Sequence, residues 1–288
     1  MPELPEVETV RRMLHATVVG RTVASVRLSG LRLRGPVPAG LPARARGRRI
    51  AAVRRTGKYL LIDLDGGVTL LSHLGMSGRW LFHEQPPSRL EPHVHARVRF
   101  GDGSEMWYQD PRRFGLLRAV ATARLDRDPA LAPLGPDPIA EPPTGATLEA
   151  VARGLRSSVK VFLLDQRRVA GIGNIYASEI LHRAGVDPRR RAGALDRAEW
   201  DRVAAETGRV LGEAIERMGT TFSAYRTLWN EPGAYGERLL VYDRAGEPCR
   251  RCGTPIRRIV QAQRSSFYCP SCQRAAGRSR PRKARSRA

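Results

Sequence analysis

The sequence predicts an α+β multidomain protein: an N-terminal antiparallel β-sandwich or barrel behind one helix, a helical part, and a small C-terminal metal-binding ribbon. Three observations predict this order. Short apolar or alternating runs, separated by Gly, Pro and Asp, extend as far as residue 121. Apolar residues then recur at helical spacing over residues 148–218, and two close pairs of cysteines follow. With 288 residues, 41% of them hydrophobic, the chain can bury more than one core.

The individual elements follow from the same patterns. A helix is expected over residues 6–15, because apolar side chains recur there every three or four positions and Gly20 supplies a stop. Six strands are expected over residues 22–28, 59–64, 68–72, 80–83, 96–100 and 116–121. Four helices are expected over residues 148–155, 159–165, 175–184 and 197–218. The Pro-, Asp- and Gly-rich stretch between the two sets predicts an interdomain linker.

The charge of the chain points to a polyanionic partner. There are 50 Lys and Arg against 28 Asp and Glu, a net charge of +22, which favours nucleic acid. A basic proteome or a ribosome-associated protein would explain the charge alone equally well. No run of about 18 apolar residues predicts a membrane span, and the start MPELPEVETV lacks the features of a signal peptide. We therefore expect a cytoplasmic protein without a membrane partner.

The four cysteines predict one structural Zn²⁺. They form two CxxC pairs separated by sixteen residues, namely Cys249, Cys252, Cys269 and Cys272. Two such turns facing each other complete the tetrahedral shell of four thiolates, which leaves no open position for catalysis. Two disulfides are a poorer interpretation for a chain without an export signal.

Lysines and glycines provide two further clues. Only three of the 50 basic residues are lysine, so Lys58 and Lys160 mark ordered positions where a compact ammonium is required, although chance retention also explains Lys160. The third lysine lies in the Arg-rich end of the chain, which is expected to be disordered. Gly171 and Gly173 predict a tight turn before a helix, where backbone N–H groups and Asn174 can face a phosphate; simple packing explains them equally well.

Eight separated motifs carry a resemblance to a known family. These are MPELPEVETVRR, GKYLL, HLGMSGRW, DPRRFG, LLDQ, GIGNIYASE, GEPCRRCGTPI and QRSSFYCPSCQ. In this order they resemble the bacterial formamidopyrimidine-DNA glycosylases, from residue 1 to about residue 274. The resemblance implies a catalytic β-sandwich at residues 2–128, a linker at 129–146, a helix-two-turns-helix DNA-binding domain at 147–238, a zinc finger at 239–273 and a disordered basic tail at 274–288.

The resemblance also implies how the N-terminus acts. After removal of Met1, the secondary amine of Pro2 attacks the sugar C1′ and forms a Schiff base. An α-amino group has a pKa of about 7.7–8.0, against about 10.4 for lysine, so a useful fraction is the free amine near neutral pH. Glu3 resembles the proton donor to the deoxyribose ring oxygen. Glu6 resembles a supporting carboxylate, or is simply an acid at a helix N-terminus.

Two cations resemble the groups that assist strand cleavage after the Schiff base has formed. Lys58 corresponds to the proton donor of the first elimination, and Arg264 to the cation of the second. Because the pKa of arginine exceeds about 12, Arg264 is expected to act electrostatically rather than as an acid.

The remaining matches concern DNA. A lesion must be flipped out of the duplex, and Met76, Arg112 and Phe114 match the residues that fill the gap. Without the flanking motifs, a core Met and Phe with a surface Arg would be the preferred interpretation. The matches to DNA-contacting positions are Lys58, His73, His93, Asn174, Tyr242 and Arg264, and Lys160 is a further candidate near the lesion. His93 and His95 without an acidic or Cys companion do not predict a metal site.

HLGMSG and DPRRFG favour the oxidised-purine branch of the family. The expected activity is therefore that of a bifunctional glycosylase and abasic-site lyase on duplex DNA that contains 8-oxoguanine, formamidopyrimidines or abasic sites. The chain is expected to be a monomer. Residues 222–229 depart from the family's usual loop over the flipped base. Three alternatives remain: an endonuclease VIII-like glycosylase for oxidised pyrimidines, a non-catalytic paralogue that binds damaged DNA, and a zinc-ribbon module without enzymatic activity.

Overall fold

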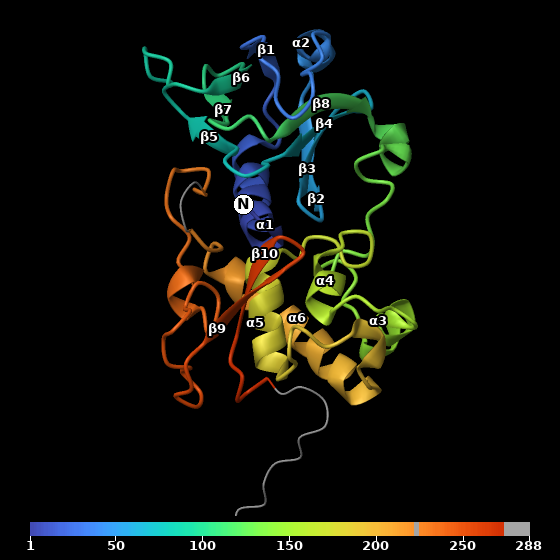
Figure 1. Ribbon diagram of the computed structural model, residues 1–288. Coiled ribbons are helices and arrows are strands. Elements are labelled where there is room, and N and C mark those ends of the chain that lie inside the picture. Colours follow the sequence, from blue (N-terminus) through green and yellow to red (C-terminus); the bar gives the residue numbers. More distant parts are fainter. Residues whose placement is uncertain (222–224, 274–288) are drawn as a thin grey trace, which may run out of the picture. The chain divides into compact units, whose positions relative to one another are not determined.

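The computed structural model describes residues 1–221 and 225–273 (Figure 1). The predicted basic tail and residues 222–224 lie outside the described residues. The chain forms two compact units that are not contiguous in sequence. The N-terminal unit comprises Met1–Pro142, Asp165–Gly173 and Gly208–Leu239, and the C-terminal unit comprises Pro143–Leu164, Asn174–Thr207 and the chain from Leu240. The continuous domain boundaries expected from the sequence therefore stay a prediction.

The N-terminal unit contains the predicted helix and two antiparallel sheets of four strands (Figure 1). The helix is α1 (Leu4–Val18). One sheet has the order β1 (Val23–Leu28), β6 (Val94–Phe100), β7 (Glu105–Gln109) and β5 (Arg79–His83). The other has the order β2 (Ile50–Thr56), β3 (Tyr59–Leu64), β4 (Val68–His73) and β8 (Leu116–Ala121). The short helices are α2 (Leu41–Ala45), the 3₁₀ turn η1 (Thr122–Arg127) and the 3₁₀ turn η3 (Tyr235–Arg238).

A single apolar core joins α1 to both sheets. The side chains of Val7, Val10 and Leu14 are completely buried on one face of α1 and belong to the same cluster as Leu60 and Trp80 from the two sheets. The helix begins at Leu4, two residues before its predicted start, because Glu6 at its third position caps the backbone N–H of Glu3. Pro5 fits this first turn because its missing N–H would have no helical partner there.

All six predicted strands are present, and the sequence missed four others. In the N-terminal unit these are β2 and β7. Strand β7, EMWYQ, is buried at every position and so lacks the alternation that marks a strand with one exposed face. Strand β2 ends in two arginines and a threonine, so its apolar pattern is short.

The C-terminal unit is built from short helices and one β-hairpin. It contains α3 (Gly145–Ala152), α4 (Val159–Leu164), α5 (Asn174–Ala184), the 3₁₀ turn η2 (Ala192–Ala194) and the part of α6 (Arg197–Glu216) up to Thr207. The rings of Phe162 and Trp200, with centroids 5.1 Å apart, form part of its core. Helix α3 begins three residues before its predicted start because Thr144 caps it.

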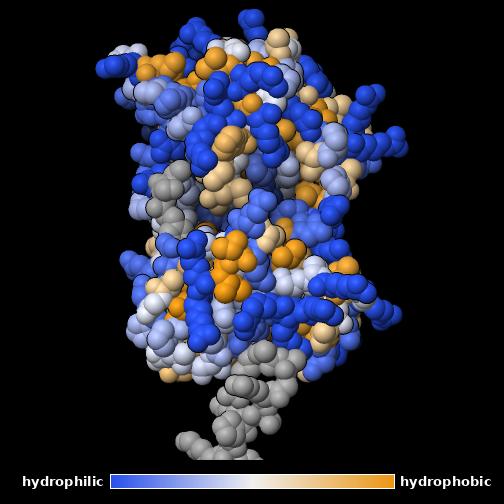
Figure 2. Space-filling view, in the orientation of Figure 1, coloured by the Kyte–Doolittle hydropathy of each residue, from blue (hydrophilic) through white to orange (hydrophobic). Residues whose placement is uncertain are grey.

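The hairpin pairs β9 (Arg257–Gln261) with β10 (Arg264–Tyr268). Its two turn residues, Ala262 and Gln263, both have positive φ, as a tight two-residue hairpin turn requires. Figure 2 shows one face of the molecule, where hydrophilic side chains surround smaller apolar patches. Among the helices described, none combines the length and the apolar character that crossing a bilayer would require.

Candidate active site

The start of the chain is buried in the N-terminal unit. Pro2 is buried, whereas the side chain of Met1 remains 46% exposed. The backbone N–H of Leu4 donates to the carbonyl of Gly171 (3.1 Å). A Cβ at Gly171 would lie 2.5 Å from Leu4 Cδ1, and one at Gly173 would lie 2.2 Å from Glu3 Cδ. Packing against the chain start therefore accounts for both glycines of the GIG turn.

Glu6 uses both carboxylate oxygens inside the protein. Its Oε2 accepts the N–H of Glu3 and its Oε1 accepts the N–H of Thr220, each at 2.7 Å, and its side chain is 1% exposed. Gly219, with φ +76°, leaves room for this carboxylate, since a Cβ there would lie 2.6 Å from Oε1. Burial and the charge of Glu6 raise the pKa of nearby Tyr225, whose hydroxyl donates to the carbonyl of Met218 (3.0 Å). Glu6 thus fixes the backbone of Glu3 to the segment after α6.

Lys58 lies on the turn between β2 and β3 and is only 7% exposed. Its Nζ donates to the carbonyl of Ile172 at 3.1 Å. Gln166 braces the same segment: its Nε2 donates to the Ile172 carbonyl (2.8 Å), and its Oε1 accepts the N–H of Gly171 (2.9 Å). The segment Gly171–Gly173 is therefore a common support for the chain start, Glu3 and Lys58.

His73 ends β4 and is held as a neutral imidazole. Its Nδ1 accepts the N–H of Gly75 at 2.9 Å, and its side chain is 8% exposed. Burial, followed by the positive charges of Arg34 and Lys58, lowers the pKa of His73 to about 3. The single ring proton then belongs on Nε2, because Nδ1 is the acceptor. His73 can donate one hydrogen bond but adds no charge at neutral pH.

The three predicted gap-filling residues lie on exposed surface of the N-terminal unit. Met76 is 39% and Phe114 is 44% exposed, so the alternative in which they fill the core does not apply. The guanidinium of Arg112 lies 4.8 Å from the centroid of the Phe114 ring.

Asp110, which the sequence analysis missed, braces the two loops that carry these three residues. It is completely buried, and its carboxylate accepts hydrogen bonds from the Ser77 hydroxyl (2.6 Å) and from the N–H of Gly115 (2.8 Å). Ser77 Oγ in turn accepts the N–H of Arg112 at 3.2 Å. The available signal was an acid at the head of DPRRFG, next to exposed cationic and aromatic residues.

The two histidines around β6 have different environments. His93 is exposed, with φ +64°, whereas His95 is 3% exposed and its Nε2 lies 3.0 Å from the carbonyl oxygen of Asp110. Among the described residues they do not belong to any group of three metal-ligating side chains.

In the C-terminal unit, Arg264 is exposed at the start of β10, and Asn174 and Tyr242 are half-buried. Lys160 is completely buried: its Nζ donates to the carbonyl of Ser265 and to Ser266 Oγ, both at 2.8 Å. Its predicted DNA contact stays a prediction, which this burial does not favour.

Glu179 orders the backbone around Tyr242, a role that the sequence analysis also missed. This carboxylate on α5 is completely buried and accepts three consecutive backbone N–H groups, those of Leu240, Val241 and Tyr242, at 2.8–3.0 Å. Burial raises the pKa of Glu179, although these hydrogen bonds oppose the increase. A single acid within GIGNIYASE gave no hint of partners some sixty positions later.

The four cysteines form a site with the dimensions of a structural zinc centre. All four Sγ atoms lie within 4.8 Å of one another, with Cys249 and Cys272 3.9 Å apart and Cys252 and Cys269 3.4 Å apart. A tetrahedral Zn²⁺ with Zn–S bonds of about 2.3 Å places its sulfurs about 3.8 Å apart. These four residues hold one structural zinc, which ties the β9–β10 hairpin to the preceding loop, and the expected cofactor is confirmed.

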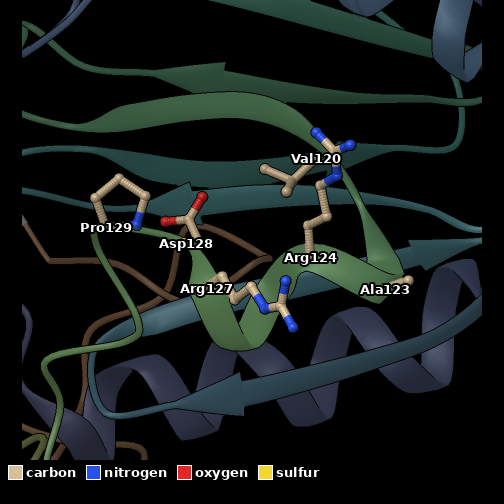
Figure 3. Close-up of a pocket in the computed structure, with 6 residues that line it drawn as sticks. All are labelled: Val120, Ala123, Arg124, Arg127, Asp128 and Pro129. Atoms are coloured by element: carbon tan, nitrogen blue, oxygen red, sulfur yellow. The ribbon is translucent and has the colours of Figure 1, made fainter.

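A separate surface pocket of about 420 Å³ lies beside β8 and η1 (Figure 3). It is lined by Val120, Ala123, Arg124, Arg127, Asp128 and Pro129. It contains none of the predicted site residues, and its acid Asp128 is paired with Arg118.

Comparisons with known proteins match the regions of the chain that contain the motifs. The formamidopyrimidine-DNA glycosylase N-terminal domain matches residues 1–117, the H2TH domain of the same enzymes matches residues 134–226, and the zinc finger found in FPG and IleRS matches residues 246–275. The formamidopyrimidine-DNA glycosylase of Methylococcus capsulatus is 46% identical over 276 residues, covering 95% of this chain and 100% of the relative. That of Cereibacter sphaeroides is 46% identical over 286 residues with the same coverage.

The chain belongs to the formamidopyrimidine-DNA glycosylase family. It is thus an enzyme, and the resemblance inferred from the motifs is confirmed. Solved structures of the family agree. The Thermus thermophilus protein has a TM-score of 0.83 at 40% identity, over 94% of this chain and 98% of that one. A Lactococcus lactis family member in complex with abasic-site DNA has a TM-score of 0.87 at 31% identity, over 95% of this chain and 100% of that one. The predicted fold class is confirmed.

The buried neutral His73 predicts a specific loss of stability in acid. Because its folded pKa of about 3 lies below the ordinary 6.5, the unfolded chain binds the extra proton between these values. The stabilisation is complete above pH 6.5 and is lost, at up to about 1.4 kcal/mol per pH unit, as pH falls toward 3. His73→Asn, whose Oδ1 can still accept the Gly75 N–H, should flatten this pH dependence in urea-unfolding measurements. Parallel curves for the two proteins would contradict the assignment.

The cysteine site predicts one zinc per chain with a structural role. Cys252→Ser should lower the bound zinc measured by atomic emission, and limited proteolysis should then cut within residues 240–273, because the hairpin loses its main cross-link. The control is Arg251→Gln, which changes an exposed residue between the same two cysteines and should retain zinc. Full zinc binding by the Ser variant would be inconsistent with a four-thiolate site.

Proposed function

We propose that this protein is a bifunctional DNA glycosylase and abasic-site lyase of base excision repair, which removes oxidised purines through a Schiff base at Pro2. The observation that carries the proposal is the buried group of Pro2, Glu3 and Lys58 on the common support Gly171–Gly173, in a chain that belongs to this family. DNA as the partner is supported by family members solved with Fapy-dG, abasic-site and carbocyclic 8-oxo-G DNA.

The first stage is base removal. The free Pro2 nitrogen attacks C1′, the bond from C1′ to the base breaks, and the base leaves with a proton. Glu3 protonates the deoxyribose ring oxygen as the ring opens, and C1′ and the Pro2 nitrogen form an iminium. Glu6 positions this stage, because it holds the Glu3 backbone through a 2.7 Å hydrogen bond.

The second stage is strand cleavage. The iminium makes the C2′ proton acidic; its removal allows the bond from C3′ to the 3′ phosphate to break, and a second elimination releases the 5′ phosphate. Water then hydrolyses the iminium and restores the Pro2 amine. Lys58 is the proton donor proposed for the first elimination. In the C-terminal unit, Arg264 stabilises the phosphate that leaves second.

DNA contacts are proposed for both units. In the N-terminal unit, Met76, Arg112 and Phe114 fill the gap left by the flipped nucleotide, and His73 donates a hydrogen bond from Nε2 to a phosphate. The exposed His93 contacts DNA as well. In the C-terminal unit, Asn174, Tyr242 and Arg264 contact phosphates.

A free Pro2 amine is the condition that the chemistry sets, and it gives a direct test. The wild-type protein, incubated with duplex DNA containing 8-oxoguanine opposite cytosine in borohydride, should give a covalent adduct at Pro2. A chain that retains Met1 should give no adduct but still bind the DNA, because an amide nitrogen is not nucleophilic. The half-exposed Met1 beside a buried Pro2 shows that the fold accommodates this extra residue.

Two outcomes would decide against the proposal. Absence of an adduct from a chain that begins at Pro2 would favour the non-catalytic paralogue. Faster trapping on an oxidised pyrimidine would favour the endonuclease VIII-like alternative. The second arm is necessary because a Lactococcus lactis relative has been solved with oxidised-pyrimidine DNA.

The exposed side chain of Phe114 gives a further prediction. Phe114→Ala should slow excision of 8-oxoguanine by about ten-fold or more, because stacking on a base contributes about 1–3 kcal/mol. Single-turnover excision from duplex DNA measures the effect. Leu90→Ala is the matched control, since Leu90 is a similarly exposed apolar residue of the same unit that lies outside the two loops. An equal effect of both substitutions would indicate that Phe114 does not enter the DNA.

A further inference from the structure

Arg55 is a buried cation to which the proposed mechanism gives no role. It lies on β2, three residues before Lys58, and its side chain is 4% exposed. A guanidinium removed from water must be paired on most of its donors. Arg55 meets this requirement with two acids from distant parts of the chain and one backbone carbonyl.

The first acid is Glu8 on α1. Arg55 Nε donates to Glu8 Oε2 at 3.0 Å, and Arg11 and Arg12 donate to Oε1 of the same carboxylate, each at 2.9 Å. Burial alone would raise the pKa of Glu8, but the hydrogen bonds from the three arginines outweigh it and hold the pKa below its ordinary value. Glu8 is therefore ionised at neutral pH, five residues after Glu3 on the helix that follows the chain start.

The second acid is Asp137, and it reaches the turn that carries Lys58. Arg55 Nη2 donates to Asp137 Oδ1 at 3.1 Å, and Nη1 pairs with Oδ2. Asp137 Oδ2 also accepts the N–H of Gly57 at 2.8 Å, while Arg55 Nη1 donates to the Gly57 carbonyl at 2.9 Å. Both polar groups of the Gly57 backbone, next to Lys58, are thus held by this pair.

The same turn has little freedom to move. Gly57 has φ +57°, and a Cβ there would lie 3.2 Å from the Ala170 Cβ. On its other side, the Lys58 ammonium is fixed by the carbonyl of Ile172. A change at the Arg55–Asp137 pair would therefore be passed to the Lys58 backbone rather than absorbed by a loose loop.

We propose that Glu8, Arg55 and Asp137, hereafter the Arg55 bridge, are positioning residues. They fix the position of Lys58 relative to α1, the helix that follows the N-terminal nucleophile. The inference rests on the proposed function. Nucleophile and proton donor must serve the same sugar and its phosphate, and a misplacement of about 1 Å costs about 100-fold in rate.

The contacts indicate which step depends on the bridge. The side chains of Arg55 and Asp137 touch the Gly57 backbone directly, whereas Arg55 reaches α1 through Glu8. The chain start also has its own supports in Glu6 and Gly171. Loss of the bridge should therefore slow elimination, in which Lys58 acts, more than formation of the Schiff base.

The test compares two rates in the same full-length, zinc-containing protein. One is formation of the borohydride-trapped adduct on 8-oxoguanine duplex DNA, and the other is nicking of a duplex with a preformed abasic site. Asp137→Asn retains the shape but removes the charge, and Arg55→Lys retains a charge but loses the planar fork. Each should leave adduct formation within about three-fold and slow nicking by about ten-fold or more.

Arg54→Gln is the matched control. Arg54 directly precedes Arg55 on β2 and forms an exposed ion pair with Asp63, with a 2.9 Å hydrogen bond from Nη2. Its removal should leave both rates unchanged. The double variant Arg55→Met, Asp137→Asn replaces two of the three charges of the bridge by uncharged groups, and Glu8 keeps its pairs with Arg11 and Arg12. If its unfolding midpoint is close to that of the wild type, slow nicking cannot be a consequence of partial unfolding.

The outcomes separate the two proposals. If adduct formation and nicking fall in equal proportion in the folded variants, or if neither falls, the positioning role of the Arg55 bridge is wrong. If the wild-type protein forms no adduct at all, the proposed function itself fails.

Discussion

The close packing of a glycine turn against the start of the chain is the constraint on which the site of the N-terminal unit depends. Residues 171–173 are nearly 170 positions from Leu4 and Glu3, and yet a single Cβ at either glycine would overlap those residues. In the same turn, the carbonyl of Gly171 accepts the Leu4 N–H and that of Ile172 accepts the Lys58 ammonium. A chain start, which is usually loose, is thereby ordered by this turn together with the Glu6 carboxylate. Glu3 and Lys58 both depend on this contact for their position.

The distribution of charge between interior and surface makes the surface more basic than the composition alone would. Among the described residues, nine acids are buried, against two lysines and the side chain of Arg55. The buried acids whose contacts were described above, such as Glu6, Asp110 and Glu179, accept backbone N–H groups or arginines, so their negative charge compensates local donors. Fewer acids then remain on the surface to offset the exposed arginines. A surface of this kind attracts phosphates over long range, which is the part of DNA binding that depends on salt and not on sequence.

Local patterns in the sequence predicted the elements that depend on local physics. Amphipathic helices, short apolar strands bounded by turn residues and paired CxxC turns leave a local signal, and α1, β3, β4 and the zinc ligands were found in this way. Strand β7 was missed because it shows no alternation and its apolar run is only three residues long, between Glu105 and Gln109. The catalytic and DNA-contacting candidates came from the family resemblance and not from spacing. Asp110, Glu179 and the acids around Arg55 were missed because each binds residues of its own unit that are distant in sequence or lie on another loop. No short sequence pattern encodes such contacts. Lys160 is the opposite case: the scarcity of lysine in the sequence singled it out, but only the fold shows that its side chain is buried.

Pro2 is buried beside a half-exposed Met1, so removal of Met1 after synthesis has a chemical consequence. While the initiator is attached, the proline nitrogen belongs to a planar amide and its lone pair is delocalised into the carbonyl. Under the proposed chemistry, the Pro2 nitrogen of a chain that retains Met1 therefore cannot attack a sugar, even when the chain is completely folded. Trimming a single residue, a routine event of protein maturation, then acts as the switch that releases a strand-cutting activity. The peptide bond between Met1 and Pro2 itself blocks the reaction until then.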